Sequence, residues 1–383
     1  MFRQNYFIRL KQRVQAHWAL QRCQKLLSSN TPVSTAPDAA SPVVPSARRR
    51  SLIASKGFLV CAALAMGLLV AGITVYTRPT WVLDRVERMH LKMSGAESYT
   101  VMVDGHRIHY YVSGPGGGEP VVLLHGLGGR SEDWMKLTPY LQRAGYRVYT
   151  PDLLGFGQSE EPHNASYSIS DQADMIVGFM NTVGLERVDL GGWSMGGWIA
   201  QKIAVDNPDR VRRLILMDSA GLKVPPRWDL SLFTPTTPAQ VDHLHAMLMP
   251  NPPAMPRFVV QDMLRLSANY GWVVKRALAS MMTAKDVMDD DLPSLKMPVL
   301  ILWGDQDRIT PLSEGYTMHA LIPQSFLRVA YGCGHIAPAS CTAQFGPELT
   351  GFLKSVYATP DRQPILRATY ELRKQQADEA AGE

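Results

Sequence analysis

The stretch RVDLGGWSMGGWIAQKIAVD, Arg187–Asp206, places one serine in a run of glycines between two tryptophans. Its first part reads as a short apolar strand, and from Gly196 onward its spacing is helical. Residues Gly192–Gly196 form G-x-S-x-G in the strand–turn–helix context of a nucleophile elbow. So sharp a turn strains the serine backbone and brings neighbouring chain close, and glycines meet both demands. The stretch therefore predicts Ser194 as a nucleophile at a helix N-terminus, where free N–H groups favour negative charge.

A serine hydroxyl is a poor nucleophile without a base and an orienting acid, which follow the elbow in the order Asp/Glu, then His. The apolar strand in MPVLILWGD is followed by Asp305 and Asp307, and the strand in SFLRVAYGCGH by His335. We predict His335 as the base rather than a structural histidine. We predict Asp307 as the acid, because Asp305 is better suited to cap the turn beginning at Gly304.

A tetrahedral oxyanion also needs preorganised donors. The residue after the nucleophile, Met195, supplies one backbone N–H, and we expect Leu127, in the loop HGLGG after VVLL, to supply the other. Leu127 and Trp193 are also candidate substrate contacts. His125 is a rival base, but its place in the chain favours a role in shaping this loop.

Short apolar runs alternate with helical patterns around this motif. Two β-rich runs split by Asp104-Gly105 predict a hairpin. After them come six further candidate strands, with helical spacing between them over 131–144, 170–183, 196–206 and 313–321. This alternation is typical of a parallel sheet with helices on both faces.

Five motifs in this order resemble the α/β-hydrolase superfamily, over about residues 95–357: VVLLHGLGGRSEDW, PDLLGFGQSEEP, GGWSMGGWIAQKIAVDNPDRVRRLILMDSAG, PVLILWGDQDRITP and GCGHIAP. The chain is most similar to the lipase/esterase branch, including membrane-anchored monoacylglycerol-lipase-like members. The resemblance implies an eight-stranded, mostly parallel sheet and a Ser194–Asp307–His335 triad. Branches with an Asp nucleophile are set aside because position 194 is Ser. Trp193 stands where lipases often have His, which leaves the acyl specificity open.

The segment 222–296 is too long for a loop. It is rich in Met and Pro, and its helical stretches are expected around 237–249, 256–268 and 271–284. In the family this position holds a helical cap. The expected organisation is a basic tail (1–56), a transmembrane helix (57–76), the hydrolase core in two parts (93–221 and 297–357), the cap (222–296) and a charged C-terminal tail (358–383).

Gly57 to Tyr76 carries no charge over 20 residues, enough to span roughly 30 Å of hydrocarbon. The alternatives are a buried core helix and a cleaved signal peptide, whose apolar centre would be shorter. Residues 1–56 hold ten Lys/Arg and one acid, a net of +9, which predicts a cytoplasmic N-terminus and a hydrolase domain on the outer side. In that oxidising compartment Cys333 and Cys341 could pair.

The rest of the chain holds 29 Lys/Arg and 33 acids, so the folded part does not have the basic character of a nucleic-acid-binding protein. No cofactor or metal is expected. The expected activity is hydrolysis of a carboxylic ester with an apolar acyl part, through an acyl-enzyme. Two enzymatic alternatives use the same triad, namely C–C bond hydrolysis of a diketone and cofactor-free perhydrolysis. A non-catalytic, membrane-tethered binding protein is the third alternative.

Overall fold

The computed structural model describes residues 47–354. It begins with α3, Ala47–Thr77, of which Phe58–Thr77 is long and apolar enough to cross a membrane, with a mean hydropathy of 2.5. This agrees with the apolar span predicted at Gly57 to Tyr76. The predictions for residues 1–46 and 355–383 lie outside the described part of the chain.

Eight strands form one sheet in the order β1-β2-β4-β3-β5-β6-β7-β8. The hairpin of β1 and β2 turns at Asp104-Gly105, as predicted, and β2 also pairs antiparallel with β4. All the remaining neighbours are parallel. The predicted eight-stranded, mostly parallel sheet is therefore confirmed. The strands are β1 Glu97–Val103, β2 His106–Ser113, β3 Pro120–Leu124, β4 Arg147–Pro151, β5 Val188–Trp193, β6 Val211–Met217, β7 Val299–Gly304 and β8 Ser325–Ala330.

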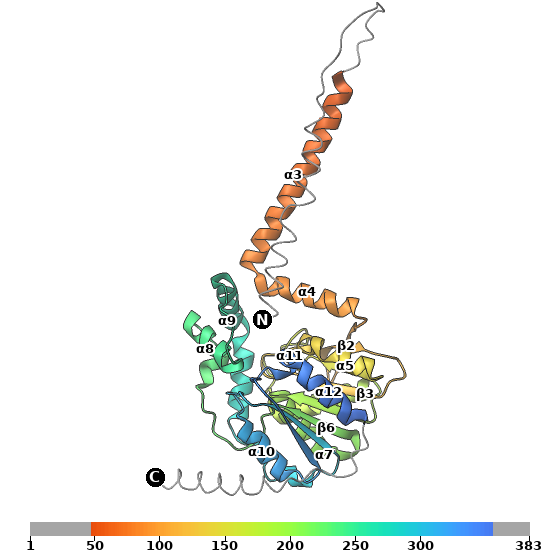
Figure 1. The fold of residues 1–383 in the computed structure, drawn as a ribbon, viewed down its shortest axis with the longest axis vertical. Coiled ribbons are helices and arrows are strands. Elements are labelled where there is room, and N and C mark those ends of the chain that lie inside the picture. Colours follow the sequence, from red (N-terminus) through yellow and green to blue (C-terminus); the bar gives the residue numbers. More distant parts are fainter. Residues whose placement is uncertain (1–46, 355–383) are drawn as a thin grey trace, which may run out of the picture. The chain divides into compact units, whose positions relative to one another are not determined.

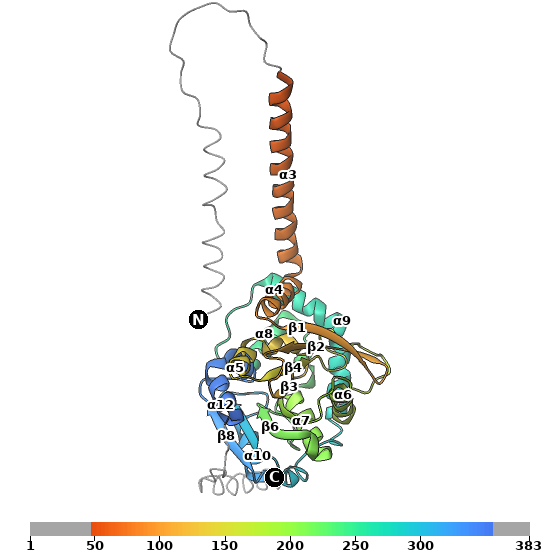
Figure 2. The same cartoon turned by 90° about the vertical axis from the view of Figure 1, so that its right-hand side faces the viewer.

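Helices cover both faces of this sheet (Figures 1 and 2). One face is packed by α6, Ile169–Thr182, α7, Met195–Asp206, and α10, Leu312–Leu321, around a large apolar core. The other is packed by α5, Thr138–Arg143, and α12, Thr342–Lys354, around a second core. The central strands β3 and β7 are apolar throughout because both of their faces are buried. Short elements complete the core: the 3₁₀ helices η1 Ser131–Lys136 and η2 Pro208–Arg210, and the helix α11 Ala337–Ser340. Two more 3₁₀ helices, η3 Leu230–Phe233 and η4 Leu292–Ser294, lie in the segment 222–296.

The cap segment holds two helices, α8, Pro238–Leu248, and α9, Arg257–Met281. The prediction of separate helices at 256–268 and 271–284 was wrong, because α9 continues through Gly271. A glycine inside a helix costs about 1 kcal/mol relative to alanine. Here the glycine is buried, and a Cβ would lie in ordinary contact, 3.4 Å from a methyl carbon of Thr234, so packing of the cap keeps the helix continuous.

One further helix, α4, Pro79–Met93, follows α3 directly and belongs to the compact unit that begins at Gly67. It lies next to η1, β1 and α9. Thr80 donates its backbone N–H to Asp262 of α9 at 3.0 Å, and Tyr76 stacks on Phe258 at the start of α9 with ring centroids 5.5 Å apart. The chain that leaves the apolar span is thus joined to the cap.

Candidate active site

Ser194 lies at the turn between β5 and α7, as predicted. Its backbone is strained, with φ 56° and ψ −122°. A Cβ at Gly192 would lie 2.1 Å from the carbonyl oxygen of Gly196, and a Cβ at Gly196 would lie 2.2 Å from that of Leu124. Both positions therefore require glycine, and the turn can close only with this sequence pattern.

Ser194, His335 and Asp307 meet in one hydrogen-bonded chain, although they come from three distant segments. The hydroxyl oxygen of Ser194 lies 2.9 Å from Nε2 of His335, and Nδ1 of His335 lies 2.8 Å from Oδ2 of Asp307. His335 is 2% exposed and Asp307 6%, which excludes most water from these contacts. With Nδ1 protonated towards the carboxylate, Nε2 is free to accept the serine proton.

Asp307 is held by further donors from the loop that follows β7. Its Oδ1 accepts the backbone N–H groups of Ile309 at 2.8 Å and Thr310 at 3.0 Å, and its Oδ2 accepts the Thr310 hydroxyl at 2.9 Å. The same hydroxyl oxygen lies 3.2 Å from Nδ1 of His335. Thr310 was not predicted, and only its place three residues after the acid could have indicated it.

Asp305 makes different contacts. Its Oδ1 accepts the backbone N–H groups of Gly332 at 2.7 Å and Cys333 at 3.2 Å. The carboxylate therefore stabilises the turn before His335. This is a structural role, as expected, but the turn expected for it was the one that begins at Gly304. The Cys333–Cys341 disulfide closes the same loop from its other side.

The two proposed oxyanion donors belong to segments that touch at Ser194. A Cβ at Gly126, next to Leu127, would lie 3.1 Å from Cβ of Ser194, and Met195 is the first residue of α7. Backbone N–H groups at a helix N-terminus lack intrahelical acceptors. The loop HGLGG is thus beside the nucleophile, in the position that the prediction of Leu127 requires.

His125 is fully buried and bonded to the backbone at both ring nitrogens. Its Nδ1 donates to the carbonyl oxygen of Gly126 at 2.8 Å, and its Nε2 accepts the N–H of Leu153 at 3.0 Å. Neither nitrogen is left to act as a base, which agrees with the loop-shaping role expected for it.

Trp193 has a contact that the sequence did not indicate. Its indole N–H donates to the carbonyl oxygen of His335 at 2.6 Å, and the two rings lie 5.7 Å apart. The side chain is half-buried, with part of its surface packed on the core beneath α5 and α12. The structure therefore gives Trp193 a part in holding the histidine loop, in addition to the substrate contact predicted for it.

Two carboxyl groups near Asp307 were missed, of which Asp218 is buried and Glu314 is half-buried. Asp218 follows β6, is fully buried, and accepts the N–H of Gly304 at 2.7 Å, while its Oδ2 has no hydrogen-bond partner among the described residues. Burial, and then the Asp307 charge, raise its pKa well above the usual range. Burial and the same charge raise the pKa of Glu314 to about 8. Asp218 directly follows a buried strand, in LILMD, and this position in the sequence could have indicated it.

The cap lies against both sides of the site. A Cβ at Gly128 would approach Val274 of α9 at 4.0 Å, and a Cβ at Gly334 would lie 2.7 Å from the carbonyl oxygen of Leu248 at the end of α8. Residues of α8 and α9 thus lie next to the loop that holds Gly128 and the loop that holds Gly334.

Comparison with known proteins gives the class that this fold and site define. Residues 119–280 and 283–339 match the family model described as the alpha/beta hydrolase fold. The chain belongs to the α/β-hydrolase family.

Relatives of two kinds are among the matches. One is the 2-hydroxy-6-oxo-2,4-heptadienoate hydrolase of Pseudomonas putida, 32% identical over 57% of this chain and 83% of the relative. Another is Lipase 1 of Psychrobacter immobilis, 26% identical over 61% of this chain and 77% of the relative. Among solved structures, a membrane phospholipase A described as a bacterial virulence factor matches with a TM-score of 0.66 and 26% identity, over 78% of this chain and all of that one.

Proposed function

We propose that this α/β-hydrolase is a membrane-anchored serine hydrolase that cleaves carboxylic esters with an apolar acyl part. The observation that carries the proposal is the series of hydrogen bonds from Ser194 through His335 to Asp307. The same polypeptide also has an apolar span. The membrane phospholipase A among the structural neighbours supports the choice of a lipid ester.

The chemistry follows from the geometry. His335 removes the proton of Ser194 as its oxygen attacks the ester carbonyl, and Asp307 stabilises the imidazolium that forms. The N–H groups of Leu127 and Met195 bind the oxyanion. His335 then protonates the leaving alcohol, and a water activated by the same nitrogen releases the acid from the acyl-enzyme.

A second candidate is hydrolysis of a C–C bond, favoured by the identity to the 2-hydroxy-6-oxo-2,4-heptadienoate hydrolase. The two reactions share the nucleophile, so the substrate distinguishes them. We expect turnover of p-nitrophenyl esters that rises with acyl length. Rapid cleavage of a vinylogous diketone, with little ester turnover, would favour the alternative.

We propose that residues 57–76 anchor the protein, with the N-terminus cytoplasmic and the hydrolase domain on the outer side. The ten basic residues before the span support this orientation. The Cys333–Cys341 disulfide is compatible with it, because such bonds persist outside the cytosol. Within the hydrolase domain we retain the division into a core of 93–221 and 297–357 and a cap of 222–296.

A further inference from the structure

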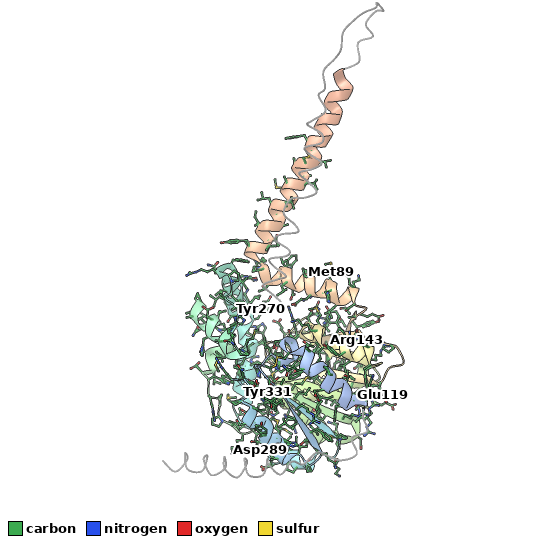
Figure 3. The ribbon with its side chains drawn as sticks, viewed as in Figure 1. Met89, Glu119, Arg143, Tyr270, Asp289 and Tyr331 are labelled. Atoms are coloured by element: carbon green, nitrogen blue, oxygen red, sulfur yellow. A yellow bond between two sulfur atoms is a disulfide. The ribbon has the colours of Figure 1, made fainter. Side chains whose placement is uncertain are left out.

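The helix α4 has the reverse of the usual polarity of a surface helix, which packs its apolar side on the core. Val86, Met89 and Met93 are spaced by three and four residues and so share one side of the helix. They are 46%, 58% and 79% exposed. Figure 3 labels Met89 on the side of α4 that points away from the sheet.

The opposite side of α4 carries the charges. Asp84 and Glu87 both pair with Arg130, the latter at 2.7 Å. Arg88 pairs with Asp84 at 2.9 Å and with the buried Glu132 at 3.0 Å. Both acids of α4 therefore face the hydrolase core, and neither carboxylate lies on the outer side.

Neither acid of α4 lies on the outer side, and the Arg and Lys side chains there are positive. Arg85 and Lys92 are exposed at its border, and so is His90. The Arg85 guanidinium lies 5.0 Å over the ring of Trp81, which is itself 49% exposed. An apolar strip bordered by cations and a tryptophan is complementary to acyl chains and phosphate headgroups.

We infer that the outer face of α4, formed by Trp81, Val86, Met89 and Met93 with Arg85 and Lys92 at its border, lies in the surface of a lipid bilayer. The inference rests on the proposed anchoring, because α3 ends at Thr77 and only Arg78 separates it from α4. A bilayer entered by α3 is thus the apolar phase nearest to this face. The helix then holds the hydrolase domain with α9 of the cap, which α4 contacts, next to the membrane.

The distance of Met89 from the lipid depends on how α4 is oriented. If α4 pointed away from the bilayer, Met89 would be about 18 Å beyond Thr77, at 1.5 Å per residue. If α4 lies in the surface, Met89 stays at the depth of the headgroups and upper acyl chains. A tryptophan at this position therefore reports which of the two holds.

The test uses the full chain in vesicles of dioleoylphosphatidylcholine, with or without lipid brominated near the middle of its acyl chains. We expect the tryptophan of Met89→Trp to add fluorescence that brominated lipid quenches, relative to the parent protein. The matched control is Met102→Trp on β1, which is 59% exposed, and its added fluorescence should not be quenched. Adding Val86→Asp and Met93→Asp to Met89→Trp should at least halve the quenching, while the melting temperature shows that the variant folds.

Equal quenching of the two tryptophans, or none at position 89, would overturn the inference. A second copy of the chain covering this face would also overturn it. That arrangement would leave position 89 unquenched and would yield disulfide-linked dimers of Met89→Cys in a background with Cys23 and Cys61 changed to Ser. The readout needs no turnover, so its failure is distinct from a failure of Ser194 to react.

Discussion

Asp307 and Asp305 are two residues apart in the sequence, yet their different contacts give them different roles. Asp307→Asn replaces the carboxylate with an amide, which faces Nδ1 of His335 and favours the wrong tautomer of its ring. The amide also faces the backbone N–H donors of Ile309 and Thr310. We expect kcat on a soluble ester to fall on the order of 10⁴-fold. Asp305→Asn, the matched control, should lower the melting temperature with a much smaller effect on kcat. The reverse pattern would mean that Asp305 is the acid.

Glu314 makes a pH-dependent contribution to stability. Its pKa is about 8 in the folded protein and about 4.5 in the unfolded chain, so between these values the folded state holds the extra proton. Stability from this group is complete below the unfolded pKa and is lost as pH rises through the folded one. Glu314→Gln does not titrate. Its melting temperature relative to wild type should therefore increase from pH 5 to pH 8, and a constant difference would contradict the assignment.

The residues that sequence reasoning reached are those with a motif around them. Ser194 lies in a run of glycines, and Asp307 and His335 each follow the end of an apolar strand. Asp218 and Glu314 have no such pattern, since their altered pKa values come from burial and from Asp307, which only the folded chain brings near. The hydrogen bond from Trp193 to His335 likewise joins segments 142 positions apart.

At the scale of elements, the loop that carries His335 is closed by the Cys333–Cys341 disulfide, at a sequence separation of 8. The bridge restricts the unfolded chain and is expected to contribute about 2 kcal/mol. Cys333→Ala with Cys341→Ala should therefore lower the free energy of unfolding by that order in denaturant titrations. Wild type treated with a reductant should match the double variant. An unchanged transition midpoint would show that the loop does not depend on the bridge.

Strand and helix periodicity predicted most elements of the core, because each has one or two buried faces that the pattern records. It was wrong for α9, where a glycine looked like a break and cap packing overrides it. It gave no indication for α4. Amphipathic spacing shows that a helix has two sides, but the ion pairs with Arg130 and Glu132 decide which side faces the protein.

For the whole molecule, the apolar span predicts that the protein stays in the membrane pellet after an alkaline carbonate wash. Protease added outside sealed cells should digest the hydrolase domain, since the basic tail favours a cytoplasmic N-terminus. Digestion of the N-terminal tail alone would invert the orientation. Recovery of a soluble protein trimmed beyond Tyr76 would identify the span as a cleaved signal.

Reaction of Ser194 with a fluorophosphonate probe tests the central claim most directly, because the probe forms a stable adduct only with an activated serine. Wild type should label covalently, with the adduct on the peptide that contains Ser194. Ser194→Ala should not label, while its melting temperature stays near that of wild type. Equal labelling of both proteins, or none of the folded wild type, would contradict a serine hydrolase built on Ser194, His335 and Asp307.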